Sequence, residues 1–221
     1  MIRRMLRRIG ASALLGAMVG ATAAAQDPAT GAQLFEQRRF AESRTVFSAA
    51  VTQNPNDAQA LTYLGRLAFN DSSYAQAAEW FERAVQFDDR NPQLLYWLGR
   101  AYGRDARKAN PFRAPGLAKR ARDCFIRALA INPNHPESRE ALVIFYRDAP
   151  GMVGGSIEKS YAELEPLKAV APFRYWLNLG DLHAHEKKWR EAEAAYTTGL
   201  ALPMGDKLLL EKRIAGLASK K

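Results

Sequence analysis

A short segment of this chain recurs almost unchanged 34 residues later. Residues 61–66 read Leu-Thr-Tyr-Leu-Gly-Arg, residues 95–100 read Leu-Tyr-Trp-Leu-Gly-Arg, and a weaker copy occupies residues 176–181. A fixed period of this length indicates repeated supersecondary units, none of which can bury its apolar face alone. Such units stack, enclose a shared core and leave a surface for a partner. The period therefore favours a binding protein over an enzyme.

A second pattern follows each Leu-Gly pair and predicts a second helix in the unit. After Gly65 it consists of Ala77, Phe81 and Ala84, which stand at i, i+4 and i+7. Residues at these spacings share one face of a helix. The small residues let two helices approach closely, and the aromatic residue fills the gap between neighbouring units. The chain is therefore expected to be all-α.

These patterns resemble the tetratricopeptide repeat family over most of residues 27–204. The resemblance implies a solenoid of about five helix–turn–helix units followed by a capping helix. The expected units are approximately residues 26–57, 58–91, 92–135, 136–172 and 173–204, and the capping helix is expected at 206–221.

Two of these units depart from the pattern. In 92–135, Ala121 follows Gly99 by 22 residues, whereas Ala77 follows Gly65 by 12, so a ten-residue insertion is expected within roughly 103–116. The unit 136–172 is degenerate. Val143 replaces its glycine, its second half has no clear small–aromatic–small stripe, and Pro166 is expected to bend its second helix or end it early.

The N-terminus has the layout of a secretory signal peptide at residues 1–25. Four Arg precede an apolar stretch from Ile9, which ends in an Ala-Ala-Ala cleavage site at Ala25. The protein is therefore expected to be exported to the periplasm with a mature domain at 26–221; the alternative is a retained membrane anchor. Cleavage would leave 28 Lys and Arg against 23 Asp and Glu, which lowers the net charge from +9 to +5.

The resemblance also implies that the first helix of each unit lines an inner groove. Tyr63 with Arg66, and Trp97 with Arg100, repeat an aromatic–Arg pattern in adjacent units. Because Arg binds carboxylates through paired hydrogen bonds, we expect a peptide with acidic or C-terminal carboxylate groups. The alternative is that the Arg residues are solvated and the aromatics complete the packing. The candidate partner-binding residues are Tyr63, Arg66, Phe69, Trp97, Arg100, Arg104, Asn178 and Asp181.

The insertion is a second candidate site because residues 103–122 contain seven basic residues and one acid, Asp105. Such an imbalance predicts a positive patch for an anionic membrane, a cell-wall polymer or an acidic protein. The alternative is an ordinary solvated segment. Nucleic acid is not expected, since the patch lacks interleaved aromatics for stacking. The candidate patch residues are Arg107, Lys108, Arg113, Lys119 and Arg120.

No catalytic, cofactor-binding or metal-binding motif is present in the sequence. His183 and His185 are two residues apart, so on a helix they point in different directions and cannot share a metal. Cys124 precedes Phe125 on an expected helix and is interpreted as a small core residue. We therefore expect a non-catalytic adaptor in the cell envelope that binds a protein segment in its groove. The alternatives are a structural protein that binds a membrane or cell-wall surface through residues 103–122, and a chain that oligomerises through the degenerate unit.

Overall fold

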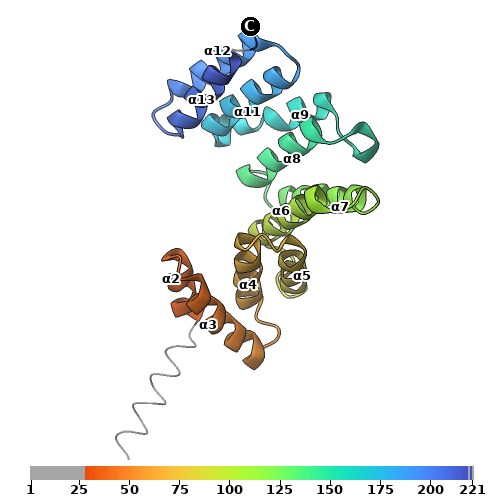
Figure 1. Ribbon diagram of the computed structural model, residues 1–221, viewed down its shortest axis with the longest axis vertical. Helices are drawn as coiled ribbons and strands as arrows, with labels where there is room; N and C mark the ends of the chain where they lie inside the picture. Colours follow the sequence, from red (N-terminus) through yellow and green to blue (C-terminus); the bar gives the residue numbers. More distant parts are fainter. Residues whose placement is uncertain (1–27, 219, 221) are drawn as a thin grey trace, which may run out of the picture. The chain divides into compact units, whose positions relative to one another are not determined.

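The computed structural model describes residues 28–218 and 220, and all of its regular elements are helices (Figure 1). The chain divides into two compact units, Met1–Asp89 and Arg90–Lys221, here called the N-terminal body and the C-terminal body. The expected all-α repeat architecture is confirmed. None of the described helices is both long enough and apolar enough to cross a membrane.

The N-terminal body contains two helical hairpins. Their helices are α2 (Pro28–Glu36), α3 (Phe40–Gln53), α4 (Ala58–Asn70) and α5 (Tyr74–Val85). Phe35, Phe47 and Leu64 are buried in one core cluster that joins the hairpins. Asp57 begins α4 as its N-cap, and its side chain accepts a hydrogen bond from the backbone N–H of Ala60 at 2.9 Å.

The C-terminal body contains three further hairpins and a last helix. Its elements are α6 (Pro92–Lys108), α7 (Ala114–Ile131), α8 (Pro136–Asp148), the 3-10 helix η1 (Gly151–Val153), α9 (Ile157–Leu164), α10 (Leu167–Val170), α11 (Pro172–His185), α12 (Trp189–Leu200) and α13 (Lys207–Leu217). Helix α13 buries Leu210 and Leu217 in a cluster with Ala192 and Tyr196 of α12. It therefore covers the apolar face of the last hairpin, as a capping helix should.

A glycine in the first helix of a hairpin lies against an aromatic ring from the second. A Cβ built on Gly65 would come 2.5 Å from Cε1 of Phe81, and one built on Gly99 would come 2.5 Å from Cε1 of Phe125. Only a residue without a side chain lets the two helices approach this closely around a ring. The Leu-Gly pair and the aromatic stripe in the sequence are thus the two halves of one contact.

The degenerate hairpin replaces this contact with another. The hydroxyl of Ser160 donates a hydrogen bond to the carbonyl oxygen of Val143 at 2.8 Å, just as Ser43 donates to Gly31 at 2.9 Å in the first hairpin. By this register Leu164 stands where the other hairpins have an aromatic ring, and it is fully buried. A branched Leu accommodates the Val143 side chain that a flat ring could not. The expected early end of the helix is confirmed, since α9 ends at Leu164 and α10 begins after Pro166.

The ten-residue insertion mostly lengthens two helices. Nine residues follow Gly99 in α6, whereas five follow Gly65 in α4. Seven residues precede Ala121 in α7, whereas three precede Ala77 in α5. Each helix thus gains four residues, about one turn, and the connection grows only from 71–73 to 109–113.

Three of the hairpins share the same tight turn. Arg38, Ser72 and Lys187 each have a left-handed backbone, with φ of 61°, 59° and 62°. Each of these residues lies seven positions after the glycine of its hairpin, at Gly31, Gly65 and Gly180. The two other hairpins, α6–α7 and α8–α9, have longer connections instead.

Candidate functional site

A cavity of about 480 Å³ lies between α6, α7, α8 and η1 of the C-terminal body. Its floor is apolar and includes Gly99, Ala121, Phe125, Ile144 and Val153. The lengthened parts of α6 and α7 border it with small residues, which leave the space between the helices unfilled. These small residues are Gly103, Ala106, Ala114 and Ala118.

The two sides of the cavity carry opposite charges. Helix α6 contributes Arg100, Arg104 and Arg107. The guanidinium of Arg100 lies over the rings of Trp97 and Tyr96, at 4.6 Å and 5.5 Å from their centroids. Such stacking orients an Arg while leaving its N–H groups in its own plane able to donate. Helix α8 contributes the carboxylates of Glu137, Glu140 and Asp148 to the opposite side.

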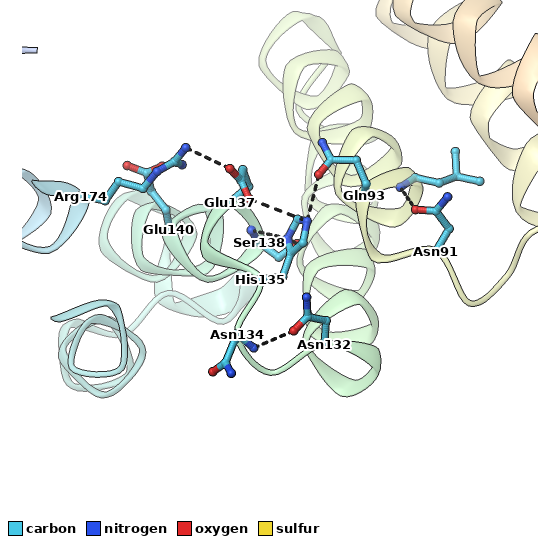
Figure 2. Close-up of polar contacts among 10 residues, drawn as sticks. Asn91, Gln93, Asn132, Asn134, His135, Glu137, Ser138, Glu140 and Arg174 are labelled. Atoms are coloured by element: carbon cyan, nitrogen blue, oxygen red, sulfur yellow. Dashed lines mark hydrogen bonds and ion pairs between the residues drawn. The ribbon is translucent and has the colours of Figure 1, made fainter. Parts of the chain in front are cut away.

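Helix α11 holds two of these carboxylates, those of Glu137 and Glu140, in position. Arg174 forms ion pairs with Glu140 at 2.5 Å and with Glu137 at 3.1 Å (Figure 2). Asn178, which is only 2% exposed, donates a hydrogen bond to Oε1 of Glu140 at 2.9 Å. Asn178 does not line the cavity itself, but it orients the Glu140 carboxylate, which does.

The predicted residues of the N-terminal body are engaged in packing within that body. Tyr63 stacks on Phe47 with centroids 4.4 Å apart. Arg66 lies 4.2 Å from the centroid of Phe35 and pairs with Glu36 at 3.8 Å. Phe69 meets the ring of Tyr74 edge-on at 5.1 Å. All three predicted residues are partly buried, so each keeps some surface for a partner.

Asp181 belongs to a polar cluster next to a second cavity, of about 430 Å³. It accepts a hydrogen bond from the Tyr196 hydroxyl at 2.7 Å and pairs with Arg213 at 3.0 Å and Arg147 at 3.5 Å. Burial, and then the hydrogen bond to Asp181, raises the pKa of Tyr196, so its hydroxyl remains a donor at neutral pH. The surroundings of Asp181 thus give it a structural part in joining α8, α11, α12 and α13.

The predicted basic patch is split between the cavity and the surface around it. Arg104 and Arg107 line the cavity, whereas Lys108, Arg113 and Lys119 are exposed without lining it. The exposed Arg120 lies over the ring of Tyr102, 4.2 Å from its centroid. From the sequence, the groove and the basic patch were expected to be separate sites. In the structure, the lengthened α6 places Arg104 and Arg107 of the segment 103–122 at the cavity.

A buried histidine connects α6 to the start of α8 (Figure 2). Nδ1 of His135 accepts a hydrogen bond from the backbone N–H of Ser138 at 3.2 Å, so His135 is the N-cap of α8. Because Nδ1 is an acceptor, the ring proton lies on Nε2, which then donates to Oε1 of Gln93 at 3.0 Å. Burial lowers the pKa of His135, the Glu137 carboxylate opposes this shift, and Arg174 adds to it.

We expect acid to weaken the fold at this histidine. The unfolded chain takes up a proton at His135 at a higher pH than the folded chain does. The stabilisation of the fold by neutral His135 is therefore fully present above pH ~6.5 and is lost as the pH falls through the lowered pKa of the folded state. Urea unfolding of the wild type and of His135→Asn should be compared at pH about 8 and about 5. Asn also caps helices but does not titrate. From pH about 8 to about 5, the free energy of unfolding should fall more for the wild type than for His135→Asn. An equal fall in both proteins would contradict the lowered pKa of His135 in the fold.

No arrangement for metal or acid–base chemistry stands out in the described part of the chain. No group of three or more His, Cys, Asp or Glu side chains is placed there to hold a metal ion. His183 lies 3.1 Å from the Tyr161 hydroxyl, which donates to Glu186 at 2.6 Å. This cluster lines neither of the two cavities described above. The side chain of Cys124 is buried in α7.

Comparison with known proteins identifies the repeats. A tetratricopeptide repeat family model matches residues 30–94. A solved structure of a thermophilic tetratricopeptide repeat protein from Thermus thermophilus is 25% identical, with a TM-score of 0.70 over 88% of this chain and 99% of that chain. A sequence comparison with curated proteins gave no match.

Two further solved structures share the fold. The pilF protein of Pseudomonas aeruginosa is 16% identical, with a TM-score of 0.65 over 89% of this chain and 90% of that chain. YrrB, described as a tetratricopeptide repeat protein with an unusual peptide-binding site, is 18% identical, with a TM-score of 0.60 over 86% of this chain and 89% of that chain.

Proposed function

We propose that this chain, which is a tetratricopeptide repeat protein, is a non-catalytic scaffold that binds a segment of another protein in the cavity between α6, α7 and α8. The observation behind this proposal is an apolar floor enclosed between an Arg-bearing and a carboxylate-bearing wall. A few polar groups around an apolar hollow are typical of binding sites that fix a ligand's orientation. The peptide-binding site in the description of YrrB, which shares the fold, supports the same use of this fold.

The walls indicate which segment fits. An apolar side chain would fill the floor above Phe125 and Ile144, where burial of its surface would drive binding. A carboxylate of the segment, from an acidic side chain or a C-terminus, would face Arg100 and Arg104. Glu137 and Glu140 on the opposite wall are already paired with Arg174 and offer no cation to that carboxylate, so the α6 wall sets the direction of the segment. The predicted residues Tyr63, Arg66, Phe69 and Trp97 remain proposed partner contacts outside this cavity, whereas Asp181 is assigned to the structural cluster described above.

The proposed location is the periplasm. The support comes from the basic and apolar layout of residues 1–25, which lie outside the described residues. Export would place the scaffold where partners of the cell envelope are assembled. A cell fractionation tests this location, since recovery of the chain only with the cytoplasm would contradict it.

An in-cell photo-crosslink tests the cavity as a binding site. A photoreactive phenylalanine would replace Phe145, an aromatic residue that lines the cavity, and in a control protein it would replace the exposed Phe87. We expect a discrete protein adduct from position 145 that is absent from position 87. The same adducts from both positions, or none from position 145, would contradict the proposal.

Charge reversal on the α6 wall should weaken this capture. Arg100→Glu combined with Arg104→Glu removes the cationic partners of the ligand's carboxylate and places like charges beside it. Because charge-assisted hydrogen bonds contribute roughly 1.5–3 kcal/mol each, the adduct yield at position 145 should fall about 10-fold or more. Arg127→Glu, on an exposed α7 position outside the cavity lining, is the matched control. Equal losses in both variants would point to a general charge effect and against this wall.

A further inference from the structure

Two large apolar side chains project into solvent from neighbouring loops of the C-terminal body. Phe112 is 96% exposed in the α6–α7 connection, and Met152 is 86% exposed in η1. Pro111, next to Phe112, and Pro150, two residues before Met152, line the same cavity. Helix η1 packs on α7, where Arg122 Nη1 donates to the Val153 oxygen at 3.5 Å. Figure 1 shows the two loops on the same side of this body. Phe112 and Met152 together are called the apolar tip.

The backbone around Phe112 is fixed by hydrogen bonds. The Asn110 side-chain oxygen accepts from the backbone N–H of Phe112 at 3.1 Å and of Arg113 at 3.0 Å. The Asn110 carbonyl also accepts from the N–H of Ala114 at 3.0 Å. This Asx turn joins the end of α6 to the start of α7, so Phe112 is held outward by an ordered loop.

The loop of Met152 is fixed in a similar way. The Pro150 carbonyl accepts from the N–H of Val153 at 2.9 Å and of Gly155 at 3.1 Å. Val153 is buried and anchors η1, while Met152 beside it faces solvent. Exposing two such side chains forgoes the hydrophobic stabilisation that burying them would give, and apolar side chains gathered on one side of a protein are typical of interaction surfaces.

Basic residues flank Phe112, one of the two residues of the apolar tip. Arg107 and Lys108 end α6, Arg113 precedes α7, and all three are exposed. The single acid of the insertion, Asp105, is 4.0 Å from Arg113. The tip therefore combines protruding apolar side chains with positive charge.

We propose that the apolar tip inserts into the headgroup region of an anionic phospholipid bilayer, with Arg107, Lys108 and Arg113 against the lipid phosphates. Apolar side chains at the boundary of the acyl chains and cations at the headgroups are the two contributions that hold proteins on anionic membranes. A bilayer needs no complementary groove, which suits two single side chains on convex loops better than a protein partner does. The apolar tip is a second surface, additional to the cavity proposed above. The apolar residues on the floor of the cavity take no part in membrane binding.

Flotation with lipid vesicles tests the proposal. The chain from Gln26 onward keeps every described residue and removes the apolar N-terminal stretch, which could bind lipid itself. It would be mixed with vesicles of phosphatidylglycerol and phosphatidylcholine in equal parts, and separately with vesicles of phosphatidylcholine alone. We expect binding to the anionic vesicles only, and its loss in about 1 M salt, where the Debye length is ~3 Å.

Variants assign the binding to the tip. Phe112→Ser with Met152→Ser should lower the partition to anionic vesicles by about 10-fold or more, because both inserted apolar side chains are lost. Met204→Ser is the matched control, since Met204 is 80% exposed and lies in the α12–α13 connection, outside the segment that carries Arg107, Lys108 and Arg113. Circular dichroism confirms that the variants are folded. No binding by the unaltered chain, or equal binding by the tip variant, would overturn the proposal.

Discussion

Replacing Gly65 by Ala is expected to lower the free energy of unfolding by about 2 kcal/mol. The new Cβ would come 2.5 Å from Cε1 of Phe81, whose ring is 0% exposed and has no space into which to move. Ala favours a helix over Gly by up to ~1 kcal/mol, so the clash must exceed this gain for the variant to be destabilised. Urea unfolding followed by circular dichroism measures the change.

The chain offers both a control and a rescue for this substitution. Gly116→Ala, in α7, places a Cβ with nothing within 4 Å, so it should be neutral or slightly stabilising. Phe81→Leu copies the pairing of Val143 with Leu164 in the degenerate hairpin. Combined with Gly65→Ala it should cost less than the two single changes added together, with a coupling of about 1 kcal/mol. Strict additivity would show that the ring is not what requires the glycine.

Replacing Asp181 by Ala is expected to cost about 3 kcal/mol of unfolding free energy. The change removes the acceptor of the Tyr196 hydroxyl, which is almost fully buried, and the weaker of two carboxylate partners of Arg147, which keeps Asp148 at 2.7 Å. A buried charge or donor that loses its partner keeps its desolvation cost without compensation. The more exposed Arg213 can return to water and should add little.

Tyr196→Phe separates the parts of this effect. It removes one hydrogen bond but leaves Asp181 paired with both Arg residues, so a loss of only about 1 kcal/mol is expected. Thermal unfolding of both variants, beside the photo-crosslink at position 145, distinguishes a structural Asp181 from a binding one. A stable Asp181→Ala protein with lost capture would place Asp181 at the partner, against the structural part inferred from its contacts.

The repeat period and the helical faces could be predicted because they arise from local rules. The aromatic residue was expected to fill the gap between neighbouring units, whereas Phe81 and Phe125 lie against Gly65 and Gly99 of their own hairpins. The degenerate hairpin lacks this contact because Leu164 replaces the ring. The correspondence of Ser160 and Leu164 with Ser43 and Phe47 becomes recognisable only in the structure, where Ser160 and Ser43 make equivalent hydrogen bonds in their two hairpins.

The candidate site was less accessible to sequence reasoning. Register placed Arg100 and Arg104 on a partner-facing side, and the cavity lies beside both. The same register did not show that Asn178 is buried behind Glu140, or that Arg66 packs on Phe35. The exposure of Phe112 and Met152 was also not expected, because the sequence of a loop does not by itself fix which way its side chains point.

The sequence by itself determined the helices, their pairing into hairpins and the family, because these follow from contacts between residues close along the chain. The tertiary structure decided where surface remains for partners. The cavity depends on how the lengthened α6 and α7 pack against α8. The apolar tip depends on two loops whose exposed residues, Phe112 and Met152, are 40 positions apart in the sequence. Such distant residues come together only when the helices pack, since packing of whole helices, rather than local propensity, fixes which side chains are covered.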